Sequence, residues 1–268
     1  MSEGALQNRT VVVTRPEARA AELCSRLEEL GAKTLPVPSI RFSRPEDIGS
    51  WHDALARRDD FTHVVFTSRV AADTFDALCA EADIRAASWL ANLTIGAIGD
   101  STGERLEEAG VPPTLVASGS TGKEFASELL ALGLLGENSR VLLPGSDIAR
   151  PELAEALRRS GASVTQVPIY RTIEEDPDRA EALFDALDRE RQPHAVTFAS
   201  PSALSGFLGI CGDRGRALLE SQSVKIVSLG PTTSEAIRSA GLVVSAQARK
   251  PSTEGLIEAI GEALGRQE

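Results

Sequence analysis

The sequence repeats itself in order, with a period of about 130 residues. Residues 11–41 align with residues 141–171, and this match places Gly31 over Gly161. The block FTSRVAADTF aligns in the same way with FASPSALSGF, and TIGAIGDSTGERLEEAGV aligns with KIVSLGPTTSEAIRSAGL. A duplication of this length predicts two similar units, each large enough to bury its own core.

Within each copy, short apolar runs alternate with segments of helical periodicity. Leu23, Leu27 and Leu30 recur at spacings of four and three, and Gly31 follows them as a left-handed helix stop. The alternation of strand and helix predicts an α/β fold with mostly parallel sheets. Strands are expected at 11–13, 64–67, 93–98, 196–199 and 224–229.

Two short extended runs contain proline and differ from the other expected strands. LPVPSIRF covers residues 35–42, and QVPIYRT covers residues 166–172. Proline cannot donate a ladder hydrogen bond, so such runs are expected at a sheet edge or in a linker. We therefore expect the chain to cross between its two units at these segments.

Local signals also predict where helices begin. Ser68 and Ser200 each follow an apolar run and are expected to cap the next helix, with Pro201 at its first position. The spacings Ser101-x-x-Glu104 and Thr232-x-x-Glu235 predict two capping boxes.

Composition excludes several partners. The formal net charge of −11 opposes binding to nucleic acid or to an anionic membrane surface. No apolar run approaches the roughly 20 residues of a membrane helix, and residues 1–10 lack the pattern of a secretory signal. A cytoplasmic protein is expected, with no membrane and no nucleic acid among its partners.

Metal binding is not expected either. Cys24, Cys79 and Cys211 lie far apart without paired spacing and indicate buried structural thiols. His63 and His194 stand just before expected strands, with no second ligand at a metal-binding spacing.

The glycine turns do not match nucleotide-binding motifs. Gly96, Gly99 and Gly103 give G-x-x-G-x-x-x-G in place of G-x-G-x-x-G. The segment SGSTGK at 118–123 lacks the first glycine of a phosphate loop, and Glu124 stands where a magnesium-binding hydroxyl is needed. We interpret this segment as a capped helix start. No cofactor is expected, and the absence of a G-x-S-x-G turn gives no support to a serine nucleophile.

Hydroxyl-rich turns follow the strands in both copies. The carboxyl ends of parallel strands bring free backbone N–H groups and positive helix ends together, an arrangement that attracts anions. Each hydroxyl taken alone is better explained as a helix cap, and only the repetition favours a role in binding a ligand with many carboxylates. The candidates in these turns are Ser68, Thr102, Ser200, Thr232 and Thr233.

The chain resembles the uroporphyrinogen-III synthase family along nearly its whole length. The resemblance is carried by VVVTRP, VPSIRF, VVFTSRVAADTF, IGAIGDSTGERLEEAG, VPIYRT, VTFASPSALSGF, SLGPTTSEAIRSAGL and KPSTEGLIEAI, in this order and spacing. It implies two similar parallel-sheet domains of the flavodoxin or Rossmann kind, joined by a two-stranded antiparallel linker. The substrate is then expected in the cleft between the domains.

The resemblance also implies how the chain is shared between the domains. Domain 1 would comprise residues 1–36 with 172–268, and domain 2 residues 46–165. Residues 37–45 and 166–171 would form the linker strands. The duplication by itself does not distinguish this exchange from two contiguous halves.

The family's reaction converts hydroxymethylbilane, which carries eight carboxylates, to uroporphyrinogen III with inversion of the last pyrrole ring. Loss of water gives an azafulvene, and closure then passes through a spiro intermediate. The resemblance implies a cofactor-free hydro-lyase of porphyrin and heme biosynthesis. It also implies a monomer, with transient contact with the upstream hydroxymethylbilane synthase as a possible partner interaction.

Site residues are transferred by the resemblance one at a time. Tyr170, in VPIYRT, matches a tyrosine suggested to assist departure of the hydroxyl. The serines and threonines named above match residues of the substrate cleft. Arg15 follows the first strand and can reach a carboxylate, although its counterpart in the second copy is Gly145.

A protein of another class remains an alternative at this level. A two-domain cytosolic sensor that closes on an anionic metabolite without chemistry would show the same turns. Product formation from hydroxymethylbilane distinguishes the two.

Overall fold

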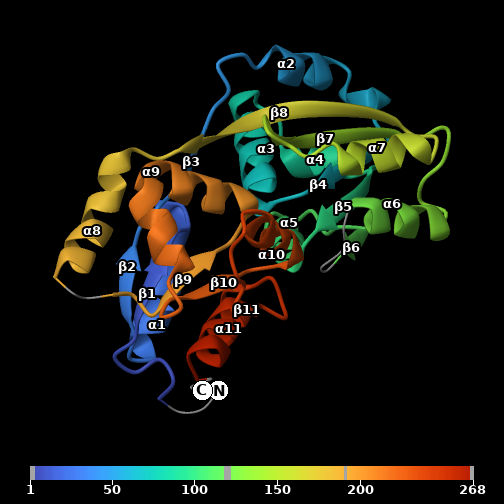
Figure 1. Ribbon diagram of the computed structural model, residues 1–268. Coiled ribbons are helices and arrows are strands. Elements are labelled where there is room, and N and C mark those ends of the chain that lie inside the picture. Colours follow the sequence, from blue (N-terminus) through green and yellow to red (C-terminus); the bar gives the residue numbers. More distant parts are fainter. Residues whose placement is uncertain (1–3, 118–121, 190–191, 266–268) are drawn as a thin grey trace. The chain divides into compact units, whose positions relative to one another are not determined.

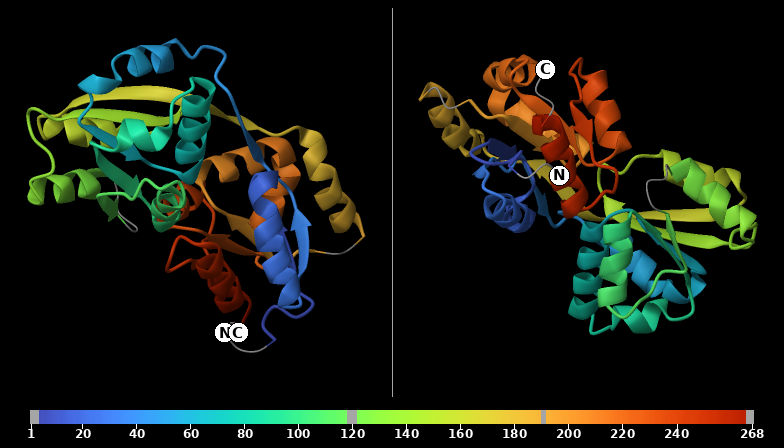
Figure 2. Two further views of the ribbon diagram at one scale, coloured as in Figure 1. Left: turned by 180° about the vertical axis from the view of Figure 1, so that it is seen from behind. Right: turned by 90° about the horizontal axis from the view of Figure 1, so that it is seen from below.

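The computed structural model describes residues 4–117, 122–189 and 192–265. The chain forms two compact units, shown in Figure 1: unit 1 is Met1–Phe42 with Thr172–Glu268, and unit 2 is Ser43–Arg171. Helices lie on both faces of the sheet in each unit (Figures 1 and 2). The expected α/β fold with two mostly parallel sheets is confirmed. No helix within the described residues is long and apolar enough to cross a membrane.

Unit 1 contains a five-stranded sheet in the order β11-β10-β9-β1-β2, with parallel pairing throughout. Its strands are β1 (Thr10–Val13), β2 (Lys33–Pro36), β9 (Ala195–Phe198), β10 (Lys225–Ser228) and β11 (Ala246–Gln247). Its helices are α1 (Glu17–Glu29), η2 (Pro177–Ala180), α8 (Glu181–Asp188), α9 (Pro201–Glu220), α10 (Pro231–Ser239) and α11 (Thr253–Gly265).

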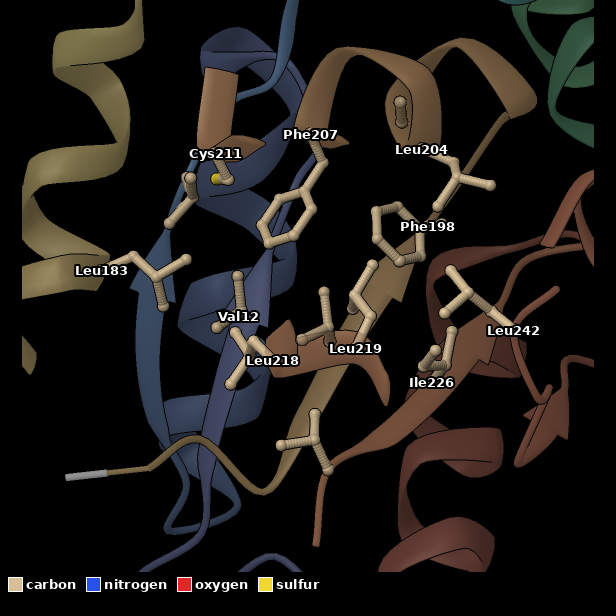
Figure 3. Packing of buried hydrophobic residues seen from close by; sticks show 14 of the residues in the cluster. Val12, Leu183, Phe198, Leu204, Phe207, Cys211, Leu218, Leu219, Ile226 and Leu242 are labelled. Atoms are coloured by element: carbon tan, nitrogen blue, oxygen red, sulfur yellow. The ribbon is translucent and has the colours of Figure 1, made fainter. Parts of the chain in front are cut away.

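The central strand β1 is buried on both faces because successive side chains point to opposite sides of a strand. Val12 joins a core cluster with Phe198 and Phe207, whose rings meet edge to face at 5.6 Å (Figure 3). Val11 and Val13 join the opposite cluster, which contains the apolar sides of α1 and α11. The three valines therefore contribute to the apolar clusters on both faces of the sheet.

The six-stranded sheet has the order β3-β8-β7-β4-β5-β6 and lies mostly in unit 2, with β3 and β8 each crossing the boundary between the two units in the chain. The strands are β3 (Ile40–Ser43), β4 (His63–Phe66), β5 (Thr94–Ile98), β6 (Leu115–Ala117), β7 (Arg140–Ser146) and β8 (Ser163–Glu174). The helices are α2 (Gly49–Ala56), η1 (Arg58–Asp60), α3 (Arg69–Glu81), α4 (Ala86–Leu90), α5 (Asp100–Glu108), α6 (Gly122–Ala131) and α7 (Glu152–Arg159).

The two faces of this second sheet have different cores. Apolar side chains of α6 and α7, Phe125 among them, cover one face. Four aromatic rings pack together elsewhere in the unit, with centroids 5.0 to 5.5 Å apart. These rings belong to Trp51, Phe66, Phe75 and Trp89. Such tilted and edge contacts add to the free energy gained by burying apolar area.

The proline-bearing runs are placed only partly as expected. β2 and β3 lie at sheet edges, which confirms the prediction for 35–42. The run at 166–172 does not lie at an edge, because β8 lies between β3 and β7, so only the linker alternative remains for it. Pro168 pairs with Gly145, and the register shifts directly after Gly145 so that Ser146 faces Tyr170. A bulge is one of the few places where a ladder tolerates the missing N–H of proline.

The predicted helix ends divide in the same way. Gly31 and Gly161 have φ of 84° and 91° and stop their helices as expected. The capping boxes expected at Ser101 and Thr232 are wrong, because α5 and α10 begin earlier, at Asp100 and Pro231, without a side-chain cap. Gly99 and Gly230 occupy the N-cap positions of these helices, so Ser101 and Thr232 lie inside the first turn. The capped helix start expected at 118–124 falls partly outside the described residues.

Candidate functional site

The carboxyl ends of neighbouring strands position the candidate residues of unit 2. Ser68 follows β4, Thr102 lies in the first turn of α5 after β5, and Tyr170 lies in β8. In the sheet order, β7 stands between β8 and β4. Parallel pairing from β8 through β5 carries these strand ends to the same edge.

A hydrogen bond joins two of the predicted residues. Ser68 Oγ lies 3.2 Å from the phenolic oxygen of Tyr170, 102 residues away in sequence. Ser68 Oγ also accepts the backbone N–H of Ala71 at 3.1 Å, which confirms the predicted helix cap. Tyr170 is only 8% exposed, so its ring is packed while its hydroxyl meets a polar partner.

The segment after β7 holds the backbone of Tyr170. The N–H of Asp147 donates to the carbonyl of Tyr170 at 3.0 Å. The guanidinium of Arg171 lies 3.6 Å from the Asp147 carboxylate and 2.8 Å from that of Glu46. The main chain of Tyr170 is thus held by Asp147, and the side chain of the next residue, Arg171, is held by two carboxylates. Sequence reasoning missed Asp147, because the bulge that brings it to β8 has no local signature.

In unit 1, Ser200 occupies the position that corresponds to Ser68. It accepts the N–H of Ala203 at 3.1 Å, and this predicted cap is also confirmed. Its hydroxyl lies 2.9 Å from that of Ser202. The two halves of the duplication therefore share the cap and differ in the second partner of the serine.

Arg15 follows β1 and donates to Thr253 Oγ1 at 3.2 Å. Burial lowers the pKa of its guanidinium. The negative charges of Glu22 and Glu254 oppose this shift, and the positive charge of Arg19 adds to it. Among the described residues, no carboxylate forms an ion pair with this cation. A desolvated guanidinium with a neutral hydroxyl partner is suited to a carboxylate ligand. Thr253 was not predicted as a site residue.

The threonines of the two turns differ in exposure. Thr102 and Thr233 are 2% and 3% exposed, whereas Thr232 is exposed. Within the described part of the chain, neither buried threonine uses its hydroxyl in a hydrogen bond. Trp89 Nε1 is the one fully enclosed side-chain polar atom without a partner there, so both hydroxyls retain some solvent contact. The fold therefore does not use the donor of either threonine.

Cysteines and histidines have structural surroundings. Burial raises the pKa of the Cys79 and Cys211 thiols to about 12, and it also raises that of Cys24. His194 accepts the N–H of Thr10 at its Nδ1, 3.0 Å away, as expected for a residue at a strand entry. In the described ranges, no three His, Cys, Asp or Glu side chains group around a possible metal position.

Comparisons with known proteins agree with this architecture. The family model described as "Uroporphyrinogen-III synthase HemD" matches residues 21–258. The chain is 28% identical over 257 residues to a protein of Methanothermobacter thermautotrophicus, covering 95% of this chain and 98% of that protein. It is 24% identical to the uroporphyrinogen-III synthase of Chlorobaculum parvum, over 96% and 99% of the two chains.

A solved structure shows the same fold. A mutant uroporphyrinogen III synthase of Thermus thermophilus superimposes with a TM-score of 0.68 at 21% identity, covering 97% of this chain and all of that one. The resemblance seen in the sequence motifs is thus confirmed by a match to most of the chain. The chain belongs to the uroporphyrinogen-III synthase family, whose named members act in porphyrin biosynthesis.

Proposed function

We propose that this protein is a uroporphyrinogen-III synthase, a hydro-lyase of the heme pathway. It would cyclise hydroxymethylbilane to uroporphyrinogen III with inversion of the last ring and loss of water. The observation that carries the proposal is the family match over residues 21–258, supported by relatives aligned over almost their full length. The proposal includes a cytoplasmic monomer that takes its substrate from hydroxymethylbilane synthase.

The demand of this reaction is orientation. Hydroxymethylbilane closes unaided to the unrearranged isomer, so the protein must fold the linear substrate until the substituted carbon of the last ring meets the azafulvene. Holding reacting atoms in one geometry supplies a large part of many enzymatic rate enhancements. Hydrogen-bond donors spread over both units suit this demand better than one strong acid does.

We assign carboxylate binding to Arg15, Thr102, Thr232, Thr233 and Ser200. The support is chemical: no carboxylate of the described chain lies within ion-pair distance of Arg15, and the Thr102 and Thr233 hydroxyls are unused by the fold. Hydrogen bonds from such donors to an ionised carboxylate are stronger than those to neutral acceptors. The linker role of 37–45 and 166–171 stays part of this proposal.

Tyr170 is assigned to the departure of the hydroxyl. Its phenol donates a proton to the leaving oxygen, the C–O bond breaks with both electrons on oxygen, and water departs. The proton lost from the pyrrole carbon in the last closure restores the phenol. Donation of this kind is worth about 10²–10⁴-fold in rate in other enzymes, and the lower end or less applies here because this hydroxyl departs readily from a pyrrolic carbon.

The test is direct. Purified protein is incubated, without added metal or nucleotide, with hydroxymethylbilane made freshly by its synthase, and the oxidised porphyrin isomers are separated. Type III product in the presence of a chelator is expected. Formation of the type I isomer alone, at the unaided rate, would overturn the proposal and leave a binding role.

A further inference from the structure

Ser68 has two hydrogen-bonding partners within the protein, and these indicate a role other than direct contact with the substrate. Its Oγ accepts from Ala71 N at 3.1 Å and lies 3.2 Å from Tyr170 Oη. We infer that Ser68 is a positioning residue, which holds the phenol of Tyr170 and donates a hydrogen bond to the phenolate formed when the proton leaves. This inference rests on the function proposed above for Tyr170.

The direction of the hydrogen bond follows from counting protons. A serine hydroxyl has one proton and two acceptor lone pairs. The N–H of Ala71 occupies one lone pair of Ser68 Oγ. Once Tyr170 has given up its proton, its oxygen can only accept a hydrogen bond. In the Ser68–Tyr170 contact, Ser68 is then the donor and the phenolate oxygen the acceptor. The bond is therefore strongest in the state that proton transfer creates, which is the condition for a contribution to rate.

The helix behind Ser68 adds to this effect. α3 is 13 residues long, and Ser68 is its N-cap. The unpaired N–H groups of the first turn carry a partial positive charge, which favours negative charge nearby. Because Ser68 accepts from that turn and contacts Tyr170, it links the positive helix end to the phenolic oxygen.

The duplication provides a matched comparison. Ser200 caps α9 with the same 3.1 Å geometry, but its hydroxyl contacts Ser202. Tyr170 is the only tyrosine in the sequence. Changes at the two serines thus remove equivalent caps, and only the change at Ser68 removes a hydroxyl from the phenol.

A spectroscopic titration tests the contact without any substrate. Because the chain has one tyrosine, the rise in absorbance near 295 nm at alkaline pH reports Tyr170 alone. Ser68→Ala is expected to raise the midpoint by roughly half to one pH unit, the effect of losing one hydrogen bond to the charged form. Ser68→Thr should restore the midpoint, and Ser200→Ala should leave it unchanged. Circular dichroism at each pH restricts the analysis to folded protein.

A kinetic cycle tests the role in turnover at neutral pH. Ser68→Ala is expected to lower kcat roughly three- to tenfold with a smaller change in KM. In a Tyr170→Phe background, the same change should have less than about a twofold effect, because the phenol it serves is absent. Ser200→Ala should act independently of Tyr170→Phe, whatever its own effect.

Two results would overturn the inference. One is an equal tyrosinate midpoint in wild type and Ser68→Ala, and the other is an undiminished effect of Ser68→Ala in the Tyr170→Phe background. If wild-type protein formed no type III isomer, the proposed function would fail by itself. The titration would still decide whether Ser68 stabilises the phenolate.

Discussion

Gly206 in α9 has no space for a side chain, and replacing it by alanine should destabilise unit 1. A methyl group there would overlap the carbonyl oxygen of Ser39 and lie 2.7 Å from Ile40 Cγ2. The Ser39 backbone has little freedom to yield, because its carbonyl accepts Glu175 N–H at 3.1 Å. Its hydroxyl, in addition, donates to the Ala203 carbonyl of the same helix at 2.8 Å.

The expected magnitude combines two terms. Overpacking against backbone costs about 3 kcal/mol, the upper part of the usual range. Exchange of glycine for alanine inside a helix returns about 1 kcal/mol. Gly206→Ala should therefore lower the free energy of unfolding by about 2 kcal/mol, measured by chemical denaturation followed by circular dichroism.

Gly209, three residues further along α9, is the matched control. A methyl group at Gly209 would meet Glu174 Oε2 at 2.5 Å, and this flexible carboxylate can rotate away. Gly209→Ala should thus be neutral or stabilising by up to about 1 kcal/mol. If Gly206→Ala unfolded at the same denaturant concentration as Gly209→Ala, the close approach of α9 to Ser39 would not exist as described.

Three further predictions concern single side chains. Tyr170→Phe should lower turnover roughly ten- to a hundredfold while melting and the type III product are retained; wild-type turnover would leave packing as the role of the ring. Thr102→Val and Thr233→Val should each reduce activity about tenfold, yet shift the free energy of unfolding by less than about 0.5 kcal/mol, since no internal hydrogen bond is lost. Comparable losses of activity and stability would point to a structural role. Burial, followed by the charge of Arg9, lowers the pKa of His194, so the unfolded chain binds its proton more readily, and stability should decline as pH falls from 7 through about 6.5. His194→Gln should flatten this decline in denaturation curves, and an unchanged slope would contradict the assignment.

The layered fold was predictable because its signals are local and repeated. Apolar runs marked the strands, Gly31 and Gly161 marked helix ends through their positive φ, and Ser68 and Ser200 marked helix starts. Each of these signals depends on a few neighbouring residues, so no tertiary contact was needed to interpret them.

The failures have a common physical cause. The spacing Ser101-x-x-Glu104 is a valid capping pattern, but α5 begins at Asp100, directly after Gly99 with φ of 89°. Pro168 was expected at an edge or in a linker, and a bulge in its own strand, β8, directly after it accommodates it inside the sheet. In both places the backbone conformation of a neighbouring residue determines the local structure, and the pattern of side-chain types does not predict that conformation.

The candidate site was predictable as a set of residue types and not as an arrangement. Ser68 and Tyr170 were both named from the sequence, but their contact spans 102 residues and depends on strand order. The pairing of Arg15 with Thr253 spans 238 residues. Such distances in sequence exceed anything that periodicity or spacing can report.

The position of β1 in its sheet determines when each unit can be completed during synthesis on the ribosome. Val12 of β1 pairs with Val196 of β9, so one of the two strands that flank β1 is translated 184 residues later. Unit 2, by contrast, is one uninterrupted stretch that ends at Arg171. It can therefore fold while β1 and β2 are still without the rest of their sheet, because domains form as soon as all their strands have emerged. During that interval the valines of β1 can pack only against α1 and β2, and their complete burial requires β9.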